Sequence, residues 1–417
     1  MIKHLKDVDA FGKNIILVFL GATMVNFFNL LYRALIAHRL NPADFAAFSS
    51  LFSVFSLVSS PLGPINTAIA KYTAEFNVRK EKRKVQALFA GFLRKILGLS
   101  LLTLLAIIFA TPYIMSKLKI QSVLPGYILA AMLSLSWIML VLSGVIQGLE
   151  FFWWLMSISV VIGALKLAFV FLFMKLGFGV AGALGAFLIS ISIGIIISFF
   201  PLRRIFSLRL IASEVNFKEI FLYLFPVGAS VFCYNVLFNI DMILVKHYFT
   251  PEESGFYSLA QMVGLIFLFL PGAISIVMLP RASGLNAKNM DTVSTMKRSL
   301  VYAAALCVIA ALLYNTFPSL VLKVFTGKVF SESLTLGRLF SVSMSFLALL
   351  YVFIIYFLSI KDLRFIKYLI LCTCLQCLAI ILFHRSLMQV QMILCINAIS
   401  LFLIHFMLFA QKQIKAS

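Results

Sequence analysis

The sequence predicts an all-α integral membrane protein of about twelve transmembrane helices, built as two parallel-repeat six-helix lobes around a central cavity. Three observations predict this fold. Hydrophobic residues make up 63% of the 417 residues and charged residues 12%, so water is not the main solvent of this chain. Apolar runs of about 20 residues recur between short polar gaps. The second half of the chain also repeats motifs of the first half.

The apolar runs define the predicted membrane spans. These are Asn14–Ala37, Phe45–Ala70, Leu88–Ala110, Pro125–Ile146, Phe152–Met174, Val180–Phe200, Glu219–Lys246, Gly255–Leu279, Leu300–Val324, Leu336–Ile360, Phe365–Phe383 and Val390–Ala410. Backbone groups facing lipid must bond within their own segment, and a barrel-type alternation is absent, so the spans are predicted to be helices. The apolar run after Lys13 lacks a cleavage motif, so we expect a first span rather than a cleaved signal.

The short gaps between spans argue against an enzyme. None is longer than about 20 residues, which leaves no room for a soluble catalytic domain. The GFGVAG segment at 177–182 formally matches GxGxxG, but no strand precedes it, so we interpret it as a turn. We expect no catalytic residue, no metal and no cofactor. The six cysteines lie in apolar segments and are interpreted as small packing residues.

The charge distribution predicts the topology. Lys and Arg number 35 against 14 Asp and Glu, for a net charge of +21. Counted gap by gap, one face of the membrane receives 22 of the basic residues and the other face 8. This asymmetry predicts a multi-pass protein of the inner (cytoplasmic) membrane with both termini in the cytoplasm. Because the basic residues form no single patch with stacking aromatics, membrane lipid is the expected partner and nucleic acid is not.

An internal repeat appears when the chain is shifted by 209 residues. The matched pairs are His38 and His247, Pro42 and Pro251, Asp44 and Glu253, Phe48 and Tyr257, Ser49 and Ser258, Asn26 and Asn235, and Gly63 and Gly272. Each half has an even number of spans, so both halves enter the membrane in the same orientation. We predict an N-terminal lobe at 1–205, an amphipathic interfacial linker at 206–217 and a C-terminal lobe at 218–417.

Proline and glycine interrupt the second span of each half at corresponding places. Pro61 and Pro64 stand in the first half, and Pro271 and Gly272 in the second. Transporters built from repeats often carry such interruptions beside the substrate path, so we interpret these four residues as gating hinges. The alternative is that they are ordinary membrane-helix residues, since Pro and Gly are frequent there.

A small number of polar residues fall inside the first half's spans, where charge is costly. Asn26, Asn29 and Arg33 are spaced i, i+3 and i+7, so they share one helix face. Lys166 lies near the middle of its span, too deep to reach either interface easily. We interpret these four residues as substrate-binding, while Arg33 is also close enough to the outer end to reach the interface by itself.

The seventh span carries Asn235, Asn239 and Asp241. The two asparagines share a face and are candidates for substrate binding, whereas Asp241 is a candidate gating residue or a structural group. Asp241 and Arg33 hold nearly equivalent positions in the two repeats, so we hypothesise that they pair across an outer gate in one state.

Five motifs resemble a known family over nearly the whole chain. They are RLNPADFAAFSSL (39–51), GVIQGLEFF (144–152), ALKLAFVFLFMKLGFGVAGALGA (164–186), NVLFNIDMILVKHYF (235–249) and YFTPEESGFYSLA (248–260). Together they resemble the polysaccharide flippase branch of the multidrug/oligosaccharidyl-lipid/polysaccharide exporter (MOP) superfamily. One departure is AAF at 46–48, where the family has glycine before the aromatic residue.

The resemblance implies a function. It suggests alternating access that moves a lipid-linked oligosaccharide, on a polyprenyl pyrophosphate, from the inner to the outer leaflet for cell-surface polysaccharide synthesis. Glycan-assembly proteins are then candidate partners, and we expect a monomer. The alternative within the superfamily is an ion-coupled small-molecule exporter, for which Asp241 is the candidate acidic site. A membrane glycosyltransferase or a scaffold would be alternatives of a different class.

Overall fold

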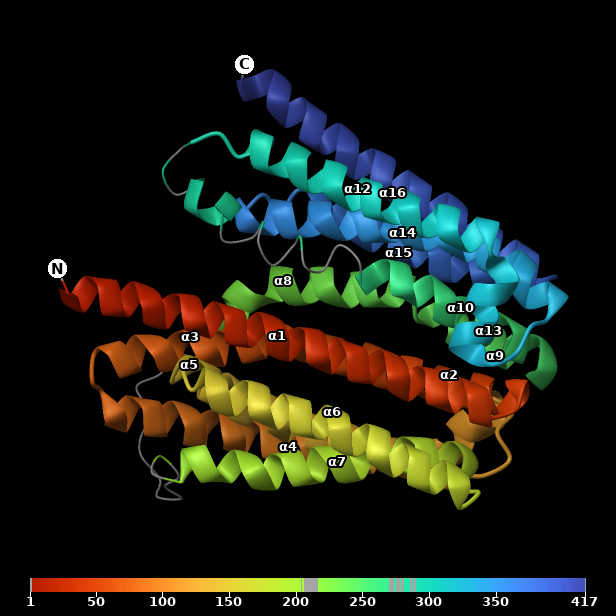
Figure 1. Cartoon of the computed structure of the whole chain (residues 1–417), viewed down its shortest axis with the longest axis horizontal. Coiled ribbons are helices and arrows are strands. Elements are labelled where there is room, and N and C mark those ends of the chain that lie inside the picture. The colour runs from red at the N-terminus through yellow and green to blue at the C-terminus, as the bar shows by residue number, and fades with distance from the viewer. Residues whose placement is uncertain are drawn as a thin grey trace. The chain divides into compact units, whose positions relative to one another are not determined.

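The computed structural model is all-α throughout its described residues, as the sequence predicts (Figure 1). It describes the backbone at residues 2–203, 205, 217–269, 274, 278, 281–285, 288 and 290–416. It describes side chains at 16–203, 205, 225–268, 274, 278, 281–285, 288 and 290–411. The predicted linker at 206–217 lies outside the described backbone except for its last residue.

The first half of the chain forms long helices. They are α1 (Ile2–Arg39), α2 (Pro42–Ser59), the 3-10 turn η1 (Ser60–Leu62), α3 (Gly63–Val78), α4 (Lys82–Lys117), α5 (Leu124–Gly148), α6 (Phe152–Lys175) and α7 (Gly179–Leu202). The second half contains α8 (Phe217–Leu237), α9 (Ile240–Tyr248), α10 (Pro251–Phe269), α12 (Val293–Thr316), α13 (Pro318–Thr326), α14 (Ser331–Ser359), α15 (Phe365–Leu382) and α16 (Leu387–Ala416).

Within the described residues, 11 helical segments are long and apolar enough to cross a membrane. They match the predicted spans one for one, except for the predicted span Gly255–Leu279. That span coincides with α10 as far as Phe269, and most of its remainder lies outside the described residues. The prediction of a multi-pass helical membrane protein is therefore confirmed.

The chain divides into two compact units, but their borders differ from the predicted lobes. Unit 1 comprises Met1–Arg39 and Val58–Gly228, and unit 2 comprises Leu40–Leu57 and Ala229–Ser417. Packing rather than chain order explains the difference: Ala46 of α2 belongs to the apolar core of unit 2. The chain therefore enters unit 2 at Leu40, before α2, and returns to unit 1 at Val58. It enters unit 2 again at Ala229, within α8.

Two contacts fasten the start of α2 within unit 2. The Lys328 ammonium donates a hydrogen bond to the Leu40 carbonyl, and burial lowers the pKa of this half-buried lysine. A Cβ atom added to Gly255 would lie 2.6 Å from the Pro42 carbonyl carbon. The backbones of α2 and α10 therefore approach as closely as glycine allows.

The predicted interruption of the second span is present. The helix stops at Ser59, passes through η1, and resumes as α3 at Gly63. Pro61 and Pro64 occupy the first turns of η1 and α3, where a missing backbone N–H costs least. This break lies directly after the passage from unit 2 to unit 1 at Leu57. Pro271 and Gly272 lie outside the described residues.

Unit 1 brings α6 close to both α1 and α7. A Cβ on Gly163 would lie 3.0 Å from the Phe28 ring, so α1 and α6 pack tightly at this point. The α6–α7 connection is a turn, as predicted, with Gly177 and Gly179 at φ values of +78° and +53°. Such left-handed geometry is cheap only for glycine.

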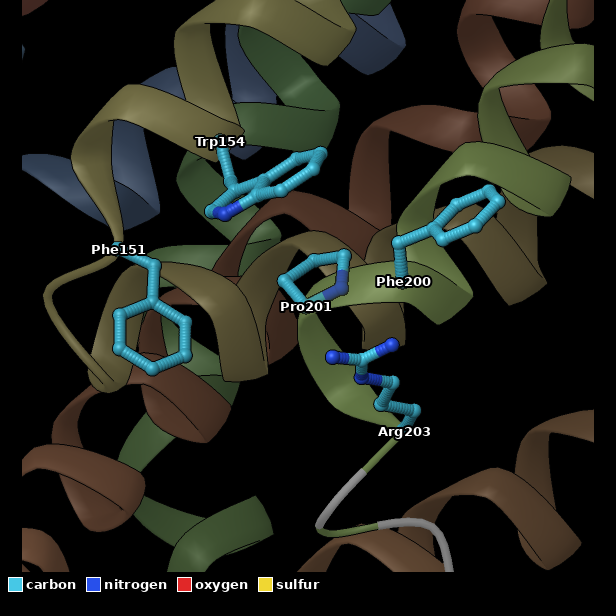
Figure 2. A pocket seen from close by; sticks show the side chains of 5 residues that line it. All are labelled: Phe151, Trp154, Phe200, Pro201 and Arg203. Carbon is cyan, nitrogen blue, oxygen red and sulfur yellow. The ribbon is translucent and has the colours of Figure 1, made fainter.

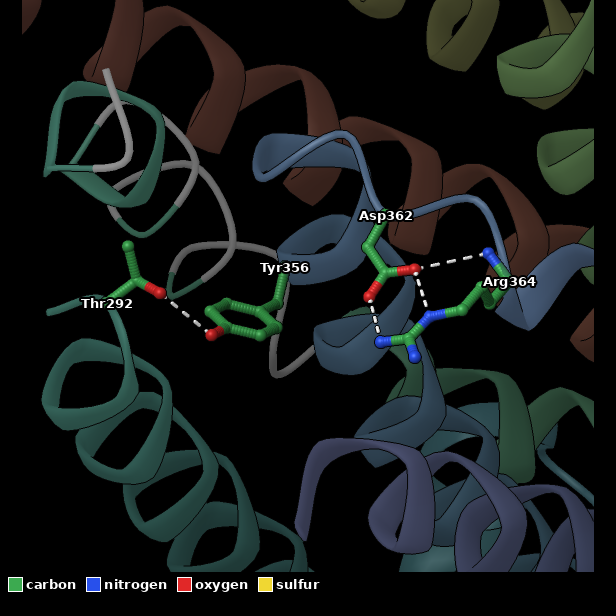
Figure 3. Close-up of polar contacts among 4 residues, drawn as sticks. All are labelled: Thr292, Tyr356, Asp362 and Arg364. Atoms are coloured by element: carbon green, nitrogen blue, oxygen red, sulfur yellow. Dashed lines mark hydrogen bonds and ion pairs between the residues drawn. The ribbon is translucent and has the colours of Figure 1, made fainter. Parts of the chain in front are cut away.

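Unit 2 is organised around α14, which packs against α10, α12 and α16. At one end of α14 the Tyr356 and Thr292 hydroxyls lie 2.8 Å apart and tie α14 to the start of α12 (Figure 3). In the α14–α15 turn, Arg364 donates two side-chain bonds to the Asp362 carboxylate, at 2.7 and 2.9 Å (Figure 3). This carboxylate raises the pKa of Arg364.

The helix starts in the two repeat loops share one capping arrangement. Asn41 accepts a bond from the Asp44 backbone N–H at 2.8 Å. Thr250 likewise accepts from the Glu253 backbone N–H at 3.3 Å, and the Glu253 carboxylate accepts from the Thr250 N–H at 3.0 Å. The capping residues Asn41 and Thr250 are each followed by a proline, Pro42 or Pro251, which is the first residue of the helix. The repeat found in the sequence is thus also a repeat of local structure.

Candidate functional site

Lys166 of α6 is a buried cation of unit 1. It lies nine residues before the end of α6 at Lys175, which is about 14 Å at the rise of an α-helix. Its exposed fraction is 5%. A lysine at this depth cannot extend its ammonium to the interface, so its charge must be accommodated within the helix bundle.

The neighbours of Lys166 come from α1 and α7. Its ammonium donates a short hydrogen bond to the Asn29 side-chain oxygen. It also lies 4.6 Å from the centre of the Tyr32 ring and 5.0 Å from that of Phe187. The Tyr32 hydroxyl donates to the Ala183 carbonyl at 2.7 Å, which holds the Tyr32 ring in place.

Among the residues that the structure describes, no acidic side chain pairs with Lys166. Within the described part of the chain, its contacts are the amide oxygen of Asn29 and two aromatic faces, and none of the ion pairs includes it. Arg33 lies one turn after Asn29 on the same face of α1. Two neighbouring cations with a neutral amide and aromatic rings form a site that attracts an anion.

The predicted substrate residues of unit 1 separate into two groups. Asn29 is half-buried and joined to Lys166, and Arg33 is half-buried one turn further along α1. Asn26 has an exposed side chain that bonds to none of the described residues. The structure therefore groups Asn29, Arg33 and Lys166 and leaves Asn26 outside this cluster.

The asparagines of unit 2 flank a break between α8 and α9. Helix α8 ends at Leu237, and Asn239, at φ −124°, is the N-cap residue that precedes α9. The Asn239 side chain donates to the Asn235 carbonyl at 3.0 Å and lies 3.5 Å from the Ser56 hydroxyl of α2. Ser56 in turn donates to the Asn235 side chain at 3.4 Å. The two asparagines thus lie together, as the shared face predicts.

The same break exposes backbone carbonyls, which side chains of unit 2 satisfy. Gln376 donates to the Leu237 carbonyl at 2.9 Å, and Gln261 donates to the Phe238 carbonyl at 3.3 Å. Unpaired carbonyls are costly inside a membrane, so these glutamines make an interrupted helix tolerable at this depth. Sequence reasoning did not identify either glutamine.

Asp241 is fully buried in the first turn of α9. Its Oδ2 atom accepts hydrogen bonds from the Tyr257 hydroxyl at 2.8 Å and from Gln261 at 3.0 Å. Its Oδ1 atom has no partner among the described residues. The Tyr257 hydroxyl also lies 3.3 Å from the Gln391 side-chain oxygen. The positive end of the α9 helix dipole favours a carboxylate at this place.

The donors around Asp241 were missed by the sequence reasoning, although one signal was available. Tyr257 occupies the position of Phe48 in the other repeat, so the second repeat adds a hydroxyl to a buried ring. Gln261 follows one turn later on the same face of α10. The extra hydroxyl of Tyr257, at a position where the first repeat has a plain ring, therefore indicated a buried hydrogen-bond partner.

These buried polar sites, in a bundle of apolar helices, are typical of a membrane transporter. Solved structures of such proteins share the fold. An inward-facing multidrug resistance MATE family transporter of the MOP superfamily is similar at a TM-score of 0.76 and 15% identity, over 94% of this chain and 96% of that chain. Lipid II flippase MurJ in its inward closed conformation is similar at a TM-score of 0.71 and 16% identity, over 95% of this chain and 87% of that one.

A MOP superfamily transporter from Pyrococcus furiosus is also similar, at a TM-score of 0.59 and 17% identity, over 95% of this chain and 94% of that chain. No curated protein matches this chain by sequence. Residues 11–286 match the polysaccharide biosynthesis protein family. The chain therefore belongs to the polysaccharide biosynthesis protein family, and its fold is that of the MOP superfamily.

Proposed function

We propose that this protein is a flippase that moves a lipid-linked oligosaccharide, carried on a polyprenyl pyrophosphate, from the inner to the outer leaflet by alternating access. Such a transporter would serve cell-surface polysaccharide synthesis, and the family name, polysaccharide biosynthesis protein, supports a role in making polysaccharide. The observation that carries the proposal is Lys166, a buried cation in a predicted span without an acidic partner among the described residues.

The chemistry of the substrate fits this cation. A sugar pyrophosphate cannot cross hydrocarbon unaided, because each polar group would lose its water at a cost of about 2–7 kcal/mol. Lys166 and Arg33 would attract the phosphates, and the Asn29 amide, which already bonds Lys166, would orient the ammonium. The lipid tail would remain among the surrounding lipids.

Unit 2 would supply the sugar contacts and part of the gate. Asn235 and Asn239 offer amide groups suited to sugar hydroxyls beside the α8–α9 break. Asp241 would act in gating, and the interruption at Pro61 and Pro64 would bend during the cycle. Pro271 and Gly272 would do the same in the second repeat.

The membrane potential supplies a driving force for this direction of movement. With the cytoplasm negative, outward movement of an anion is favoured by about 2.3 kcal/mol per charge per 100 mV. Neither ATP hydrolysis nor a cofactor is then required. We expect transport to accelerate when an inside-negative potential is imposed.

A headgroup-accessibility assay tests the proposal. The purified protein is placed in liposomes that carry a fluorescent polyprenyl-pyrophosphate oligosaccharide, and a membrane-impermeant reagent reports the fraction exposed outside. We expect wild type to expose the inner pool, and Lys166→Ala and Arg33→Ala to slow this exposure strongly. Lys175→Gln is the matched control, because Lys175 ends the same helix and lies 4.4 Å from the Phe171 ring. Equal exposure in protein-free liposomes would reject the flippase function.

One observation favours a second candidate, an ion-coupled small-molecule exporter. The fully buried Asp241 has a carboxylate oxygen, Oδ1, without a partner among the described residues. A buried carboxylate of this kind is suited to take up a proton or a cation during a cycle. This candidate requires drug efflux that depends on a Na⁺ or H⁺ gradient and is lost in Asp241→Asn. Gradient-independent movement of the lipid-linked sugar would contradict it.

A further inference from the structure

A hollow at one end of unit 1 is separate from the buried charges. It has a volume of about 260 Å³ and is lined by Phe151, Trp154, Phe200, Pro201 and Arg203 (Figure 2). Phe151 and Trp154 come from the start of α6, while the other three residues come from the end of α7. The hollow therefore lies where two predicted spans meet the same membrane surface.

The lining combines an apolar side with two hydrogen-bond donors. Figure 2 shows the Arg203 guanidinium beside Pro201, the Trp154 indole on the other side of Pro201, and the Phe200 ring directed away from the other labelled side chains. Trp154 is 40% exposed and Phe200 is 59% exposed, so both rings are available to lipid. Tryptophan and arginine are the residues that anchor helices at the headgroup level of a bilayer.

The two polar groups lack protein partners within the described residues. No described side chain or carbonyl accepts a hydrogen bond from the Arg203 guanidinium or from the Trp154 indole N–H. Glu150 is next to Phe151 in the α5–α6 turn, but it is not among the residues that line the hollow. An arginine and an indole N–H facing one space are well suited to a phosphate group.

The position and size of the hollow favour the phosphate of a lipid headgroup over a soluble phosphate compound. The α5–α6 turn and the end of α7 lie on the membrane face that receives 22 of the basic residues, the predicted cytoplasmic face. Anionic lipids enrich that leaflet next to basic segments. A hollow of about 260 Å³ is smaller than the usual pocket for an entire small molecule. It suits a headgroup whose acyl chains stay in the bilayer beside Phe200.

We propose that this hollow binds the headgroup phosphate of an anionic phospholipid from the surrounding leaflet. Arg203 holds the phosphate, the Trp154 indole N–H donates a second bond, and the exposed Phe200 ring packs against the upper part of an acyl chain. The site is independent of the cluster around Lys166, because it uses the ends of α6 and α7 rather than their middle.

Native mass spectrometry of the full-length protein tests this proposal. The protein is titrated in detergent with phosphatidylglycerol against a phosphatidylcholine background, and bound anionic lipid is counted. The test variants are Arg203→Gln, which removes the charge, and Trp154→Phe, which keeps a ring but removes the N–H. Arg298→Gln is the matched control, because Arg298 is an exposed arginine at the start of α12 on the same predicted face.

We expect Arg203→Gln to weaken phosphatidylglycerol binding about fivefold, the usual effect of one basic residue at a lipid surface. Trp154→Phe should weaken it about twofold, and Arg298→Gln should leave it within about twofold of wild type. Equal losses in Arg203→Gln and Arg298→Gln would show only general attraction to a basic surface and would overturn the site. Displacement of the lipid by glycerol phosphate at equal concentration would also overturn it, since the ligand would then be a soluble phosphate.

Discussion

Lys166 in unit 1 and Asp241 in unit 2 are both buried ionisable groups in predicted spans, yet their surroundings differ. Asp241 receives bonds from a hydroxyl and an amide and lies in the first turn of a helix, which favours its negative charge. The Lys166 ammonium has three donors, and the contacts that the described residues offer it are one amide oxygen and two ring faces. The comparison teaches that the structure surrounds one oxygen of Asp241 with hydrogen-bond donors, whereas it gives the Lys166 ammonium a single amide oxygen and ring faces among the described residues.

The largest expected effect is on transport. Replacing Lys166 by glutamine keeps a donor near Asn29 but removes the cation. Losing one partner of a buried charge contact costs about 2–5 kcal/mol, so transport should fall at least about thirtyfold. The thermal unfolding midpoint should not fall, because a buried cation without a counterion stabilises the fold little. Parallel losses of transport and stability would mean that Lys166 is structural.

For Asp241 we expect the opposite of Lys166, namely a clear loss of stability on substitution. Asp241→Ala removes the closer acceptor of the Tyr257 hydroxyl and of the Gln261 amide. Each donor keeps only a longer contact at 3.3 Å, with the Gln391 side-chain oxygen and the Phe238 carbonyl respectively. We expect a loss of about 2–3 kcal/mol in unfolding free energy, measured by thermal unfolding in detergent. Tyr257→Phe is the control, because Phe48 at the equivalent repeat position shows that a plain ring is tolerated. A double-mutant cycle of Asp241→Asn with Tyr257→Phe should show coupling, and strict additivity would argue against the pair.

The two repeats should also differ at one matched position. Ala46 and Gly255 correspond, but a Cβ on Gly255 would lie 2.6 Å from the Pro42 carbonyl carbon. Gly255→Ala should therefore destabilise the protein by about 1–3 kcal/mol through overpacking. Ala46→Gly should cost about 1–2 kcal/mol, through helix entropy and the loss of one fully buried methyl group. An unchanged unfolding midpoint in Gly255→Ala would contradict the close approach of α2 and α10.

The smallest effects are expected where the repeats are alike. Asn41→Ala and Thr250→Ala each remove the cap of a helix that begins at a proline. Each should cost about 1 kcal/mol in unfolding free energy. The lowering of the unfolding midpoint should be similar for both variants. A negligible loss of unfolding free energy in one variant would show that only the other cap stabilises its helix.

The sequence predicted much of the fold because the relevant physics is local. Lipid forces long apolar segments into helices, so 11 spans were readable from hydropathy alone. The repeat loops, with their prolines and capping residues, were visible from a single offset. The break at Pro61 and Pro64 followed from proline chemistry, which acts within one helical turn.

Sequence reasoning located part of the candidate site. Depth in a span identified Lys166, and helical spacing placed Asn29 and Arg33 on a common face. The same spacing also included Asn26, which the structure leaves exposed and outside the cluster. Helical spacing shows which side chains of α1 share a face. It does not show which of them lie opposite a given residue of the neighbouring helix α6.

The sequence by itself determined the membrane setting, the helices, the repeat and the deep lysine, because each depends on the solvent and on residues nearby in the chain. Only the tertiary structure decided that α2 packs within unit 2, that Tyr257 and Gln261 bond Asp241, and that Asn29 bonds Lys166. These contacts join residues far apart in the sequence, and their geometry depends on side-chain packing between helices rather than on any local pattern.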